Sequence, residues 1–440
     1  MQSVDQILAP QWIIPVEPAG EVLEDHLIVI DDGRIVDVGP SEQLHQAYTA
    51  HQLIPLPDQV VVPGLVNTHT HAAMTLLRGY ADDLPLMTWL QEHIWPAEQA
   101  HAREAFVRTG SELAMLEMLR GGVTCFNDMY FFPEVTAEAA AAAGMRATVG
   151  MILIGFPTAY AAHPDEYLEK GQALHASWQQ HPLIDTVMAP HAPYTVSESD
   201  LVRAAELAES LDRRIHMHIH ETLGEIEDSL EKTGQRPLMR LDAMGLVGPR
   251  LLAVHMTHLD ERERERVQAT GTHIIHCPEA NLKLGSGIAP IADLAARGAS
   301  IAIGTDGAAS NNDLDMLGEM RTAALLAKGS AKDATALPAH QALELATLGG
   351  ARALGREAEI GSIVAGKSAD LVAFDLSGPE SQPVHNPLSQ LVYATGRSQA
   401  RHVWIAGQQL LQDGEATTLD SQQIGQQARE WRDTLAAIHQ

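Results

Sequence analysis

Histidine and acidic side chains follow several short apolar runs of this chain, and their types and spacing suit a metal ion. His69 and His71 end the first of these runs, and alternate residues of an extended strand share a face, so both rings can point at one ion. His218 and Glu221 end a later run, and Asp306 ends the last one. Three imidazoles and one carboxylate, with water in an open position, are a donor set suited to a catalytic zinc ion.

Each of these features also has a purely structural interpretation. His216 and His220 share the strand face of the later run and are better interpreted as core histidines or as supports for a ligand. Taken alone, His255 would be a core histidine and Asp306 a turn aspartate between glycines. Glu221 stands three residues past a candidate ligand, where its carboxylate could contact a water on the ion without binding the ion itself.

The position of the lysines favours one metal ion per subunit. Barrels that hold two metals usually bridge them with a modified lysine from the fourth strand, and no lysine lies between Lys170 and Lys232. We therefore expect one Zn²⁺ per subunit, although iron or manganese could occupy the same ligands.

Composition indicates a globular enzyme of the cytoplasm. The formal charge of −28, from 57 acidic and 29 basic residues, would repel nucleic-acid polymers and anionic membrane surfaces. The two cysteines are too few for a disulfide scaffold, and the N-terminus lacks a secretory pattern. We expect a small-molecule substrate, no membrane contact and a cytoplasmic location.

The elements that must position these side chains are short apolar segments alternating with helical ones. Eight such units predict a (β/α)8 TIM-like barrel, with its active site at the carboxyl ends of the strands. A doubly wound open sheet would also alternate, but it does not explain polar residues at so many strand ends. The predicted strands are the run before His69 and the segments 123–126, 147–153, 186–190, 214–220, 251–255, 272–276 and 300–304.

The two ends of the chain predict one accessory domain, a small β-sandwich. Alternating segments at 12–16, 26–30 and 34–39, with an Asp32-Gly33 hairpin turn, are matched near the other end by 361–363, 369–374 and 402–407. We expect residues 1–61 and 359–440 to form this domain around a barrel of residues 62–358. A terminal helix is predicted over 420–440.

The ordered set of motifs resembles the amidohydrolase superfamily, although each motif is weak singly. Within it, the segment from Leu77 to Leu90 resembles the branch of methylthioadenosine and S-adenosylhomocysteine deaminases, neighbours of the triazine chlorohydrolases. The resemblance runs from about Asp31 to Phe374. Its motifs are His69-Thr70-His71, His218-x-x-Glu221, His255, the segment from His276 to Leu284, Gly304-Thr305-Asp306-Gly307 and the segment from Gly361 to Asp370.

The resemblance implies a role for each catalytic residue. His69, His71, His218 and Asp306 would be the metal ligands. Glu221 would carry a proton from the attacking water to N1 of adenine, while His255 and Asp306 orient that water toward C6. Ammonia would leave, and the inosine analogue would remain.

The resemblance also implies three contacts to a nucleoside substrate. Glu98 would accept hydrogen bonds from the ribose diol, although a glutamate in a first helical turn after proline is also common. His191 would contact the purine. Trp89 would pack on the base, although an ordinary core tryptophan is an equal alternative.

Substrate choice and assembly remain open at this stage. Between Met151 and Gln172 the only lysine or arginine is Lys170, so no arginine clamp for a homocysteine carboxylate is evident, and methylthioadenosine and adenosine are favoured. A deaminase of guanine or a pterin, a triazine hydrolase, and an inactive binding protein on the same scaffold are the alternatives. Barrels of this type often associate, so we expect a homo-oligomer.

Overall fold

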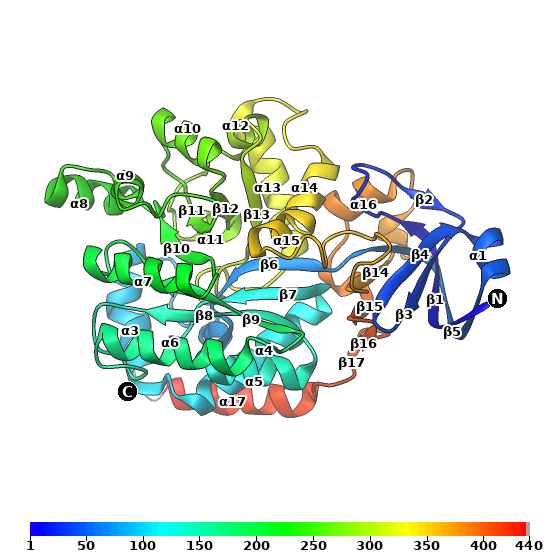
Figure 1. The fold of residues 1–440 in the computed structure, drawn as a ribbon, viewed down its shortest axis with the longest axis horizontal. Helices are drawn as coiled ribbons and strands as arrows, with labels where there is room; N and C mark the ends of the chain where they lie inside the picture. The colour runs from blue at the N-terminus through cyan, green and yellow to red at the C-terminus, as the bar shows by residue number, and fades with distance from the viewer. Residues whose placement is uncertain (437–440) are drawn as a thin grey trace.

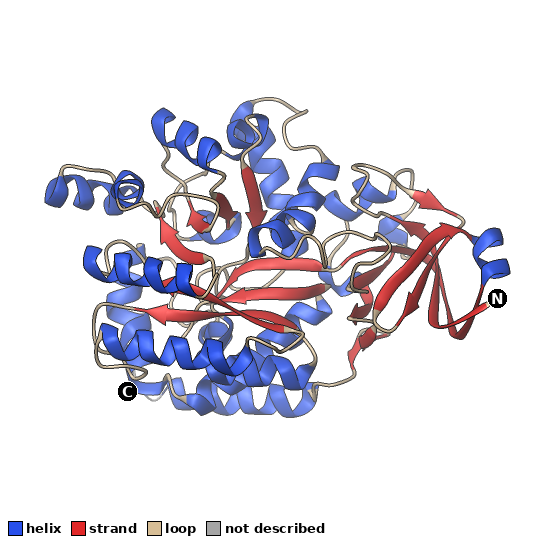
Figure 2. Cartoon of the chain, in the orientation of Figure 1, coloured by secondary structure: helices blue, strands red, loops and turns tan. Residues whose placement is uncertain are grey.

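The computed structural model describes residues 1–436, and it contains two sheets built from different parts of the chain (Figure 1; Figure 2). One sheet has eight parallel strands in the chain order β6 to β13. The other is a nine-stranded sheet made by the two ends of the chain. The (β/α)8 barrel and the accessory β domain predicted above are both present.

The eight barrel strands match the predicted segments closely, because each is a nearly continuous buried apolar run, as parallel strands covered by helices require. They are β6 (Leu65–Thr70), β7 (Val123–Asp128), β8 (Arg146–Leu153), β9 (Ile184–Pro190), β10 (Ile215–Ile219), β11 (Leu251–His255), β12 (His273–His276) and β13 (Ser300–Ile303).

Side-chain and backbone contacts between β6 and β13 bring the two ends of the strand order together. The Thr68 hydroxyl donates to the carbonyl of Ile303 at 2.7 Å, and the Asp306 amide donates to the carbonyl of His69 at 3.0 Å. Gly304 lies against the backbone of His69, where an added Cβ would be only 2.7 Å from the His69 nitrogen. This contact places the last strand beside the first candidate ligand.

Helices and short helical turns connect the strands and extend to both sides of the barrel (Figure 1). The connections from β6 to β10 contain η1 (Ala72–Leu77), α2 (Leu86–Thr88), η2 (Trp89–Ile94), α3 (Trp95–His101), α4 (Glu104–Arg120), α5 (Pro133–Ala143), α6 (Pro164–Trp178) and α7 (Glu198–Ser210). The later connections contain α8 (Leu223–Thr233), α9 (Pro237–Ala243), α10 (Glu261–Thr270), α11 (Pro278–Lys283), α12 (Ile291–Ala296), α13 (Met316–Ala331), α14 (Ala339–Leu345) and α15 (Leu348–Leu354).

The accessory sheet buries both of its faces around β3, because alternate residues of a strand point to opposite sides. Ile28 and Ile30 join one apolar cluster, and Leu27 and Val29 join another that includes Leu44 of α1 (Ser41–Ala47). The strands are β1 (Gln2–Ile13), β2 (Leu23–Glu24), β3 (His26–Asp31), β4 (Arg34–Pro40), β5 (Tyr48–Pro63), β14 (Leu371–Asp375), β15 (Ala400–Ile405), β16 (Gln408–Gln412) and β17 (Glu415–Ala416).

Val61 and Val62 lie in β5 of the accessory sheet, and the chain crosses to the barrel at Gly64, before the strand that leads to the two histidines. One detail of the prediction was wrong. Segment 361–363 forms a bend instead of a strand. At Gly64 a Cβ would meet the Thr124 side chain at 2.0 Å, so the close approach of the two elements requires a glycine here.

The terminal helix returns to the barrel. Helix α17 (Ser421–Ala436) packs its Trp431 ring 5.3 Å from that of Phe106 in α4, and residues 437–440 of the predicted helix lie outside the described residues. The remaining short elements are η3 (Pro379–Ser381), α16 (Pro387–Tyr393) and η4 (Arg397–Gln399). Within residues 1–436 no helix has the length and apolarity needed to cross a membrane.

Candidate active site

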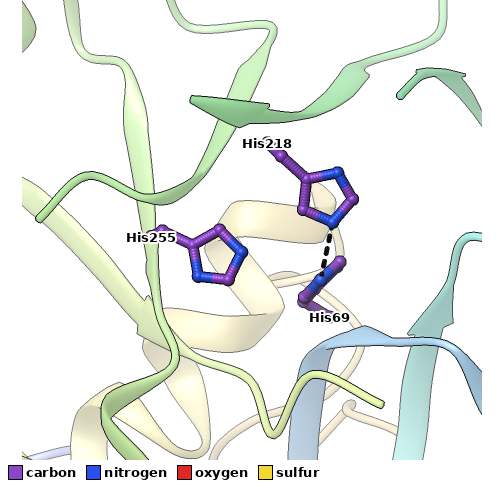
Figure 3. A group of neighbouring side chains, drawn as sticks. All are labelled: His69, His218 and His255. Atoms are coloured by element: carbon purple, nitrogen blue, oxygen red, sulfur yellow. Dashed lines mark hydrogen bonds between the residues drawn. The ribbon is translucent and has the colours of Figure 1, made fainter. Parts of the chain in front are cut away.

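The six residues predicted to bind metal or to catalyse the reaction meet at one place. His69 lies in β6, His218 in β10 and His255 at the end of β11, while Asp306 follows β13. Figure 3 shows the rings of His69, His218 and His255 turned toward a common centre. The carboxyl ends of parallel strands share one edge of the barrel, and this is where such enzymes place their chemistry.

The donor atoms are close enough to share one metal ion. The Nε2 atoms of His69 and His71 both lie 3.3 Å from Oδ1 of Asp306, and Nε2 of His69 lies 3.2 Å from Nε2 of His218. His69 thus belongs to two overlapping groups, one with His71 and Asp306 and one with His218 and His255, whose donor atoms lie within 4.8 Å of one another. Imidazole and carboxylate donors in this arrangement fit a zinc-type ion.

Backbone carbonyls fix the tautomers of two candidate ligands. Nδ1 of His71 lies 2.6 Å from the carbonyl of Met129, and Nδ1 of His218 lies 2.7 Å from the carbonyl of His191. A carbonyl can only accept, so both Nδ1 atoms must carry the proton. In each neutral ring Nε2 is then left with a free lone pair toward the centre, as metal ligation requires.

His216 lies behind the site, in the supporting position expected for it. Its Nε2 lies 2.9 Å from Nδ1 of His69, and its Nδ1 lies 3.2 Å from the Asn127 amide. The ring is fully buried, and burial lowers its pKa well below the usual value, so it is neutral. His220 is also buried, and its Nε2 accepts the Leu238 amide at 3.1 Å on the side of α9.

The carboxyl group of Glu221 faces His255 beside the ligand cluster. Its Oε2 lies 3.8 Å from Nε2 of His255, whose Nδ1 contacts Oδ1 of Asn281 at 2.8 Å. Thr257 donates to the Glu221 carbonyl at 2.8 Å, and the Glu221 amide donates to Glu225 at 2.9 Å, so the backbone is held on both sides. Burial raises the pKa of Glu221, as suits a group that exchanges protons near neutral pH.

Asp306 and His71 form a charge pair in the cluster. Although burial disfavours the charged ring, hydrogen bonding to Asp306 raises the pKa of His71 to about 9. Burial likewise opposes ionisation of Asp306, but the hydrogen bonds from His69 and His71 hold its pKa well below the usual value. His69 is different, because burial lowers its pKa to about 4. In the absence of a metal, Asp306 is therefore an anion beside one protonated and one neutral imidazole.

Two residues at strand ends, His255 and Asp306, have a strained backbone conformation that sets the direction of their side chains. His255 has φ 75° and Asp306 has φ 64°, both in the left-handed region that non-glycine residues seldom occupy. Asp306 is held there by its own neighbours: Ser310 donates to its Oδ2 at 2.8 Å and the Gly307 amide to its Oδ1 at 2.7 Å. The last strand therefore delivers a carboxylate with a fixed orientation.

The predicted substrate-binding residues line one cavity with this cluster. Trp89, Glu98 and His191 line this central cavity together with Glu221, His255 and Asp306. Burial raises the pKa of Glu98 to about 7 and lowers that of His191 to about 3, so His191 is neutral. Trp89 is buried and begins η2, a π-helical turn of a kind often found at functional sites.

Four residues at the site received no role from the sequence. Asn281 orients His255, Ser310 orients Asp306, Asn127 contacts His216, and Tyr194 lines the central cavity. Asn281 stands inside the motif after His276, and Ser310 is four residues past Asp306, so proximity was the only available signal. The roles assigned to the predicted site residues stay predictions, although the structure brings all of them together.

Comparison with known proteins places the chain in a family. The model of the amidohydrolase family matches residues 60–410. The chain belongs to the amidohydrolase family. The family predicted from the motifs is thereby confirmed, and this amidohydrolase is a hydrolytic enzyme.

Close relatives cover almost the whole length of this amidohydrolase. It is 48% identical to a 5-methylthioadenosine/S-adenosylhomocysteine deaminase of Teredinibacter turnerae, covering 99% of this chain and 98% of the relative, and 45% identical to one of Saccharophagus degradans, covering 98% and 97%. A crystal structure of an adenosine deaminase from Xanthomonas campestris with bound zinc is 50% identical, covers 99% of both chains and has a TM-score of 0.98. A zinc complex of an atrazine chlorohydrolase from Arthrobacter aurescens, 24% identical with a TM-score of 0.90 and covering 97% and 99%, shares the fold.

Proposed function

We propose that this amidohydrolase deaminates the adenine ring of 5′-methylthioadenosine, and also accepts adenosine and S-adenosylhomocysteine, with the inosine analogue and ammonia as products. One observation carries the proposal: Glu221, His255 and residues of the histidine–aspartate cluster line the same cavity as Glu98. The cavity therefore offers proton-transfer groups for a ring and a separate acceptor for a sugar. The names of the near-full-length relatives support this assignment.

The proposal includes one zinc ion, held by His69, His71, His218 and Asp306. Their donor atoms belong to two groups that overlap at His69, and Nδ1 of His71 and of His218 each bonds a backbone carbonyl, so Nε2 is the atom that would bind the ion. When bound, the ion would lower the pKa of a water molecule and make it a nucleophile at neutral pH.

Glu221 does the proton transfer in this proposal. Its raised pKa lets it take a proton from the attacking water and give it to N1 of the adenine ring, which makes C6 more electrophilic. Oxygen adds at C6, which becomes tetrahedral. The second proton of the water passes to the amino group, the carbon–nitrogen bond then breaks, and the nitrogen leaves as ammonia. His255, oriented by Asn281, and Asp306, oriented by Ser310, would direct the water toward C6.

Glu98, His191 and Trp89 would hold the nucleoside. Glu98 would accept hydrogen bonds from the ribose diol, His191 would contact the purine, and Trp89 would pack against the base. Guanine, a pterin or a triazine has no ribose diol for Glu98 to bind. The site therefore favours a nucleoside over these alternatives.

Two further parts of the proposal concern the cellular location and the oligomeric state of the enzyme. We propose that it works in the cytoplasm, where the free buried thiols of Cys125 and Cys277 stay reduced, and that it forms a homo-oligomer. Light scattering at several protein concentrations would measure the assembly.

The experiment that tests the function is ultraviolet absorbance of parallel incubations. The zinc-loaded protein is given methylthioadenosine, S-adenosylhomocysteine, adenosine, guanine and a chlorotriazine, before and after dialysis against a chelator. We expect conversion of the adenine nucleosides, loss after chelation and recovery with zinc. Conversion of guanine or the triazine alone would reject the nucleoside assignment, and full activity without metal would reject the zinc.

A further inference from the structure

Charged residues from two of the motif segments meet beside the central cavity, and the reaction described above does not use them. Asp82 lies in the segment from Leu77 to Leu90, and Lys283 lies in the segment from His276 to Leu284. Their side chains form an ion pair, with Nζ and Oδ1 2.6 Å apart. Lys283 is the last residue of α11, which follows β12, whereas Asp82 lies in the connection after β6. The pair therefore joins the connections that follow the first and seventh barrel strands.

The same ammonium group also binds the connection after the last barrel strand, β13. Nζ of Lys283 donates to Oδ1 of Asn312 at 2.6 Å and to the carbonyl of Ala309 at 3.2 Å. An ammonium group has three N–H donors, and with Asp82 each of them has an acceptor here. The Asn312 side-chain amide donates in turn to Oδ2 of Asp82 at 3.3 Å. One lysine thus ties together three connections at the carboxyl ends of the strands.

This lysine lies next to the two residues that orient candidate catalytic groups. Asn281, two residues before Lys283, contacts Nδ1 of His255 at 2.8 Å. Ser310 directly follows a carbonyl that accepts from Lys283, and its hydroxyl donates to Oδ2 of Asp306 at 2.8 Å. His255 and Asp306 are the groups proposed to direct the water toward C6. The spacing between their two supports therefore depends on the contacts of Lys283.

The first turn of α11 is fastened to the same connection by a different residue. Glu319 of α13 is fully buried, and its Oε2 accepts the backbone amide of Glu279 at 3.2 Å. Its Oε1 accepts the side-chain amide of Asn311, which also donates to the carbonyl of Thr305 at 2.8 Å. Lys283 makes the corresponding contacts at the last residue of α11, so the helix is held to the connection after β13 at both ends.

We propose that Lys283 is a positioning residue, which ties together the connections after β6, β12 and β13 and so keeps His255 and Asp306 aimed at the same water molecule. The inference rests on the proposed function and extends it to a side chain that does not line the central cavity. Because the two aimed groups act on the attacking water, loss of the lysine contacts slows the chemical step and leaves nucleoside binding in place.

Lys283→Met tests the proposal, because it removes all three donors and leaves an unbranched side chain. The Lys283 side chain is 21% exposed, so the variant should fold. Misplacement of catalytic groups by about 1 Å can cost up to ~100-fold in rate, so kcat for methylthioadenosine should fall about 10-fold or more. KM should not change, since the lost interaction acts only in the transition state. Backbone hydrogen exchange should accelerate together in segments 78–88, 278–284 and 305–312.

Lys328→Met is the matched control, because Lys328 is also a half-buried lysine that fastens a connection through three acceptors. Its Nζ donates to the carbonyls of Ala334, Ala336 and Leu337 at 3.0, 2.6 and 3.2 Å. In the described chain these residues do not line the central cavity. Lys328→Met should accelerate exchange around residues 334–337 and leave kcat unchanged. An equal fall of kcat in the two lysine variants would overturn the proposal.

A double variant shows whether Lys283 acts through Ser310. The fall of kcat in Lys283→Met/Ser310→Ala should be smaller than the product of the factors of the two single variants, because the second change removes a contact that the first has already displaced. A fall equal to that product, an unchanged kcat in Lys283→Met, or a rise in KM at constant kcat would overturn the positioning role. No deamination of any adenine nucleoside by the wild-type protein would instead reject the proposed function.

Discussion

At the scale of single residues, the group proposed for proton transfer stands apart from the candidate metal ligands. Glu221 faces His255 at 3.8 Å, while the candidate ligands cluster around Asp306. Two hydrogen bonds hold the Glu221 backbone independently of the ligands. A change to the Glu221 carboxyl group should therefore affect chemistry without releasing the metal.

Replacing Glu221 by glutamine tests this separation. The amide cannot shuttle a proton, so kcat should fall by about 10²–10⁴-fold while the zinc content stays at the wild-type value. Steady-state kinetics and elemental analysis of the purified variant measure the two quantities. Glu227→Gln, an exposed exchange of the same kind in α8, should change neither. Near-normal turnover by the Glu221 variant would remove this residue from the proton-transfer role.

The raised pKa of Glu98 predicts that the binding of a nucleoside substrate depends on pH. Burial raises its pKa to about 7, so the carboxylate is present above that pH and is progressively neutralised below it. The ionised form accepts hydrogen bonds from a ribose diol more strongly than the neutral form does. KM for methylthioadenosine should therefore rise as the pH falls through about 7, the pKa of this carboxyl group.

A matched substrate isolates that contact. 2′,3′-Dideoxyadenosine lacks both hydroxyls, so its KM should be higher at all pH values and should not follow the titration of Glu98. The measurement is KM for both nucleosides across the neutral range. Parallel pH profiles for the two would contradict the diol contact.

The site residues show what a sequence can reveal at this scale. His69, His218, His255 and Asp306 were predictable because each ends an apolar run, and strand ends converge in a parallel barrel. Asn281 and Ser310 lie on the loops and helices beyond the strands, where no periodicity reports the direction of a side chain. Their contacts depend on backbone geometry such as the positive φ of His255 and Asp306.

At the scale of elements, the meeting of β6 and β13 positions the metal site. Gly304 ends β13 against the His69 backbone, and Asp306 donates its amide to the His69 carbonyl. Gly304→Ala would place a methyl group 2.7 Å from the His69 nitrogen and displace the end of β6. Overpacking of this kind costs about 1–3 kcal/mol.

The Gly304→Ala variant should therefore melt at a lower temperature and bind less zinc. Thermal unfolding and metal titration measure these effects. Gly248→Ala is the control, because nothing lies within 4 Å of its added Cβ and its φ is not positive. Equal behaviour of the two variants would show that the β6–β13 contact does not hold the ligands in place.

The strands also show where a local apolar pattern is not sufficient to predict structure. Buried apolar runs identified all eight barrel strands, since parallel strands covered by helices lack alternation. β5 and β6 are both apolar on either side of Gly64, so only the Pro63-Gly64 pair marks where the chain passes from one sheet to the other. Segment 361–363 has strand-like composition, but no neighbouring strand pairs with it.

At the scale of the whole molecule, a buried ion pair joins the barrel to the accessory sheet. Arg146 begins β8, and its guanidinium binds both oxygens of Asp370, with Nε–Oδ2 at 2.9 Å. Glu359 lies 3.2 Å from the same guanidinium, and both Arg146 and Asp370 are about 1% exposed. No sequence pattern predicted this pair, because its members are 224 positions apart and belong to different domains.

Asp370→Asn should destabilise the protein by about 3 kcal/mol, because a buried guanidinium would lose its main partner. The free energy of unfolding from denaturant titration measures the effect. Glu415→Gln removes the partner of Arg120 in an exposed pair, 78% exposed at Glu415, and should change stability little. A small effect of Asp370→Asn would mean that the two domains are held by apolar contacts instead.

The most direct test of the central claim is the fate of oxygen in the reaction. Methylthioadenosine is incubated with the zinc-loaded protein in ¹⁸O-labelled water. The mass of the product is measured by mass spectrometry, and the released ammonia is assayed. The account predicts 5′-methylthioinosine with one ¹⁸O atom in the ring substituent and one ammonia per turnover. An unlabelled product, or recovery of unchanged methylthioadenosine, would contradict hydrolytic deamination at this site.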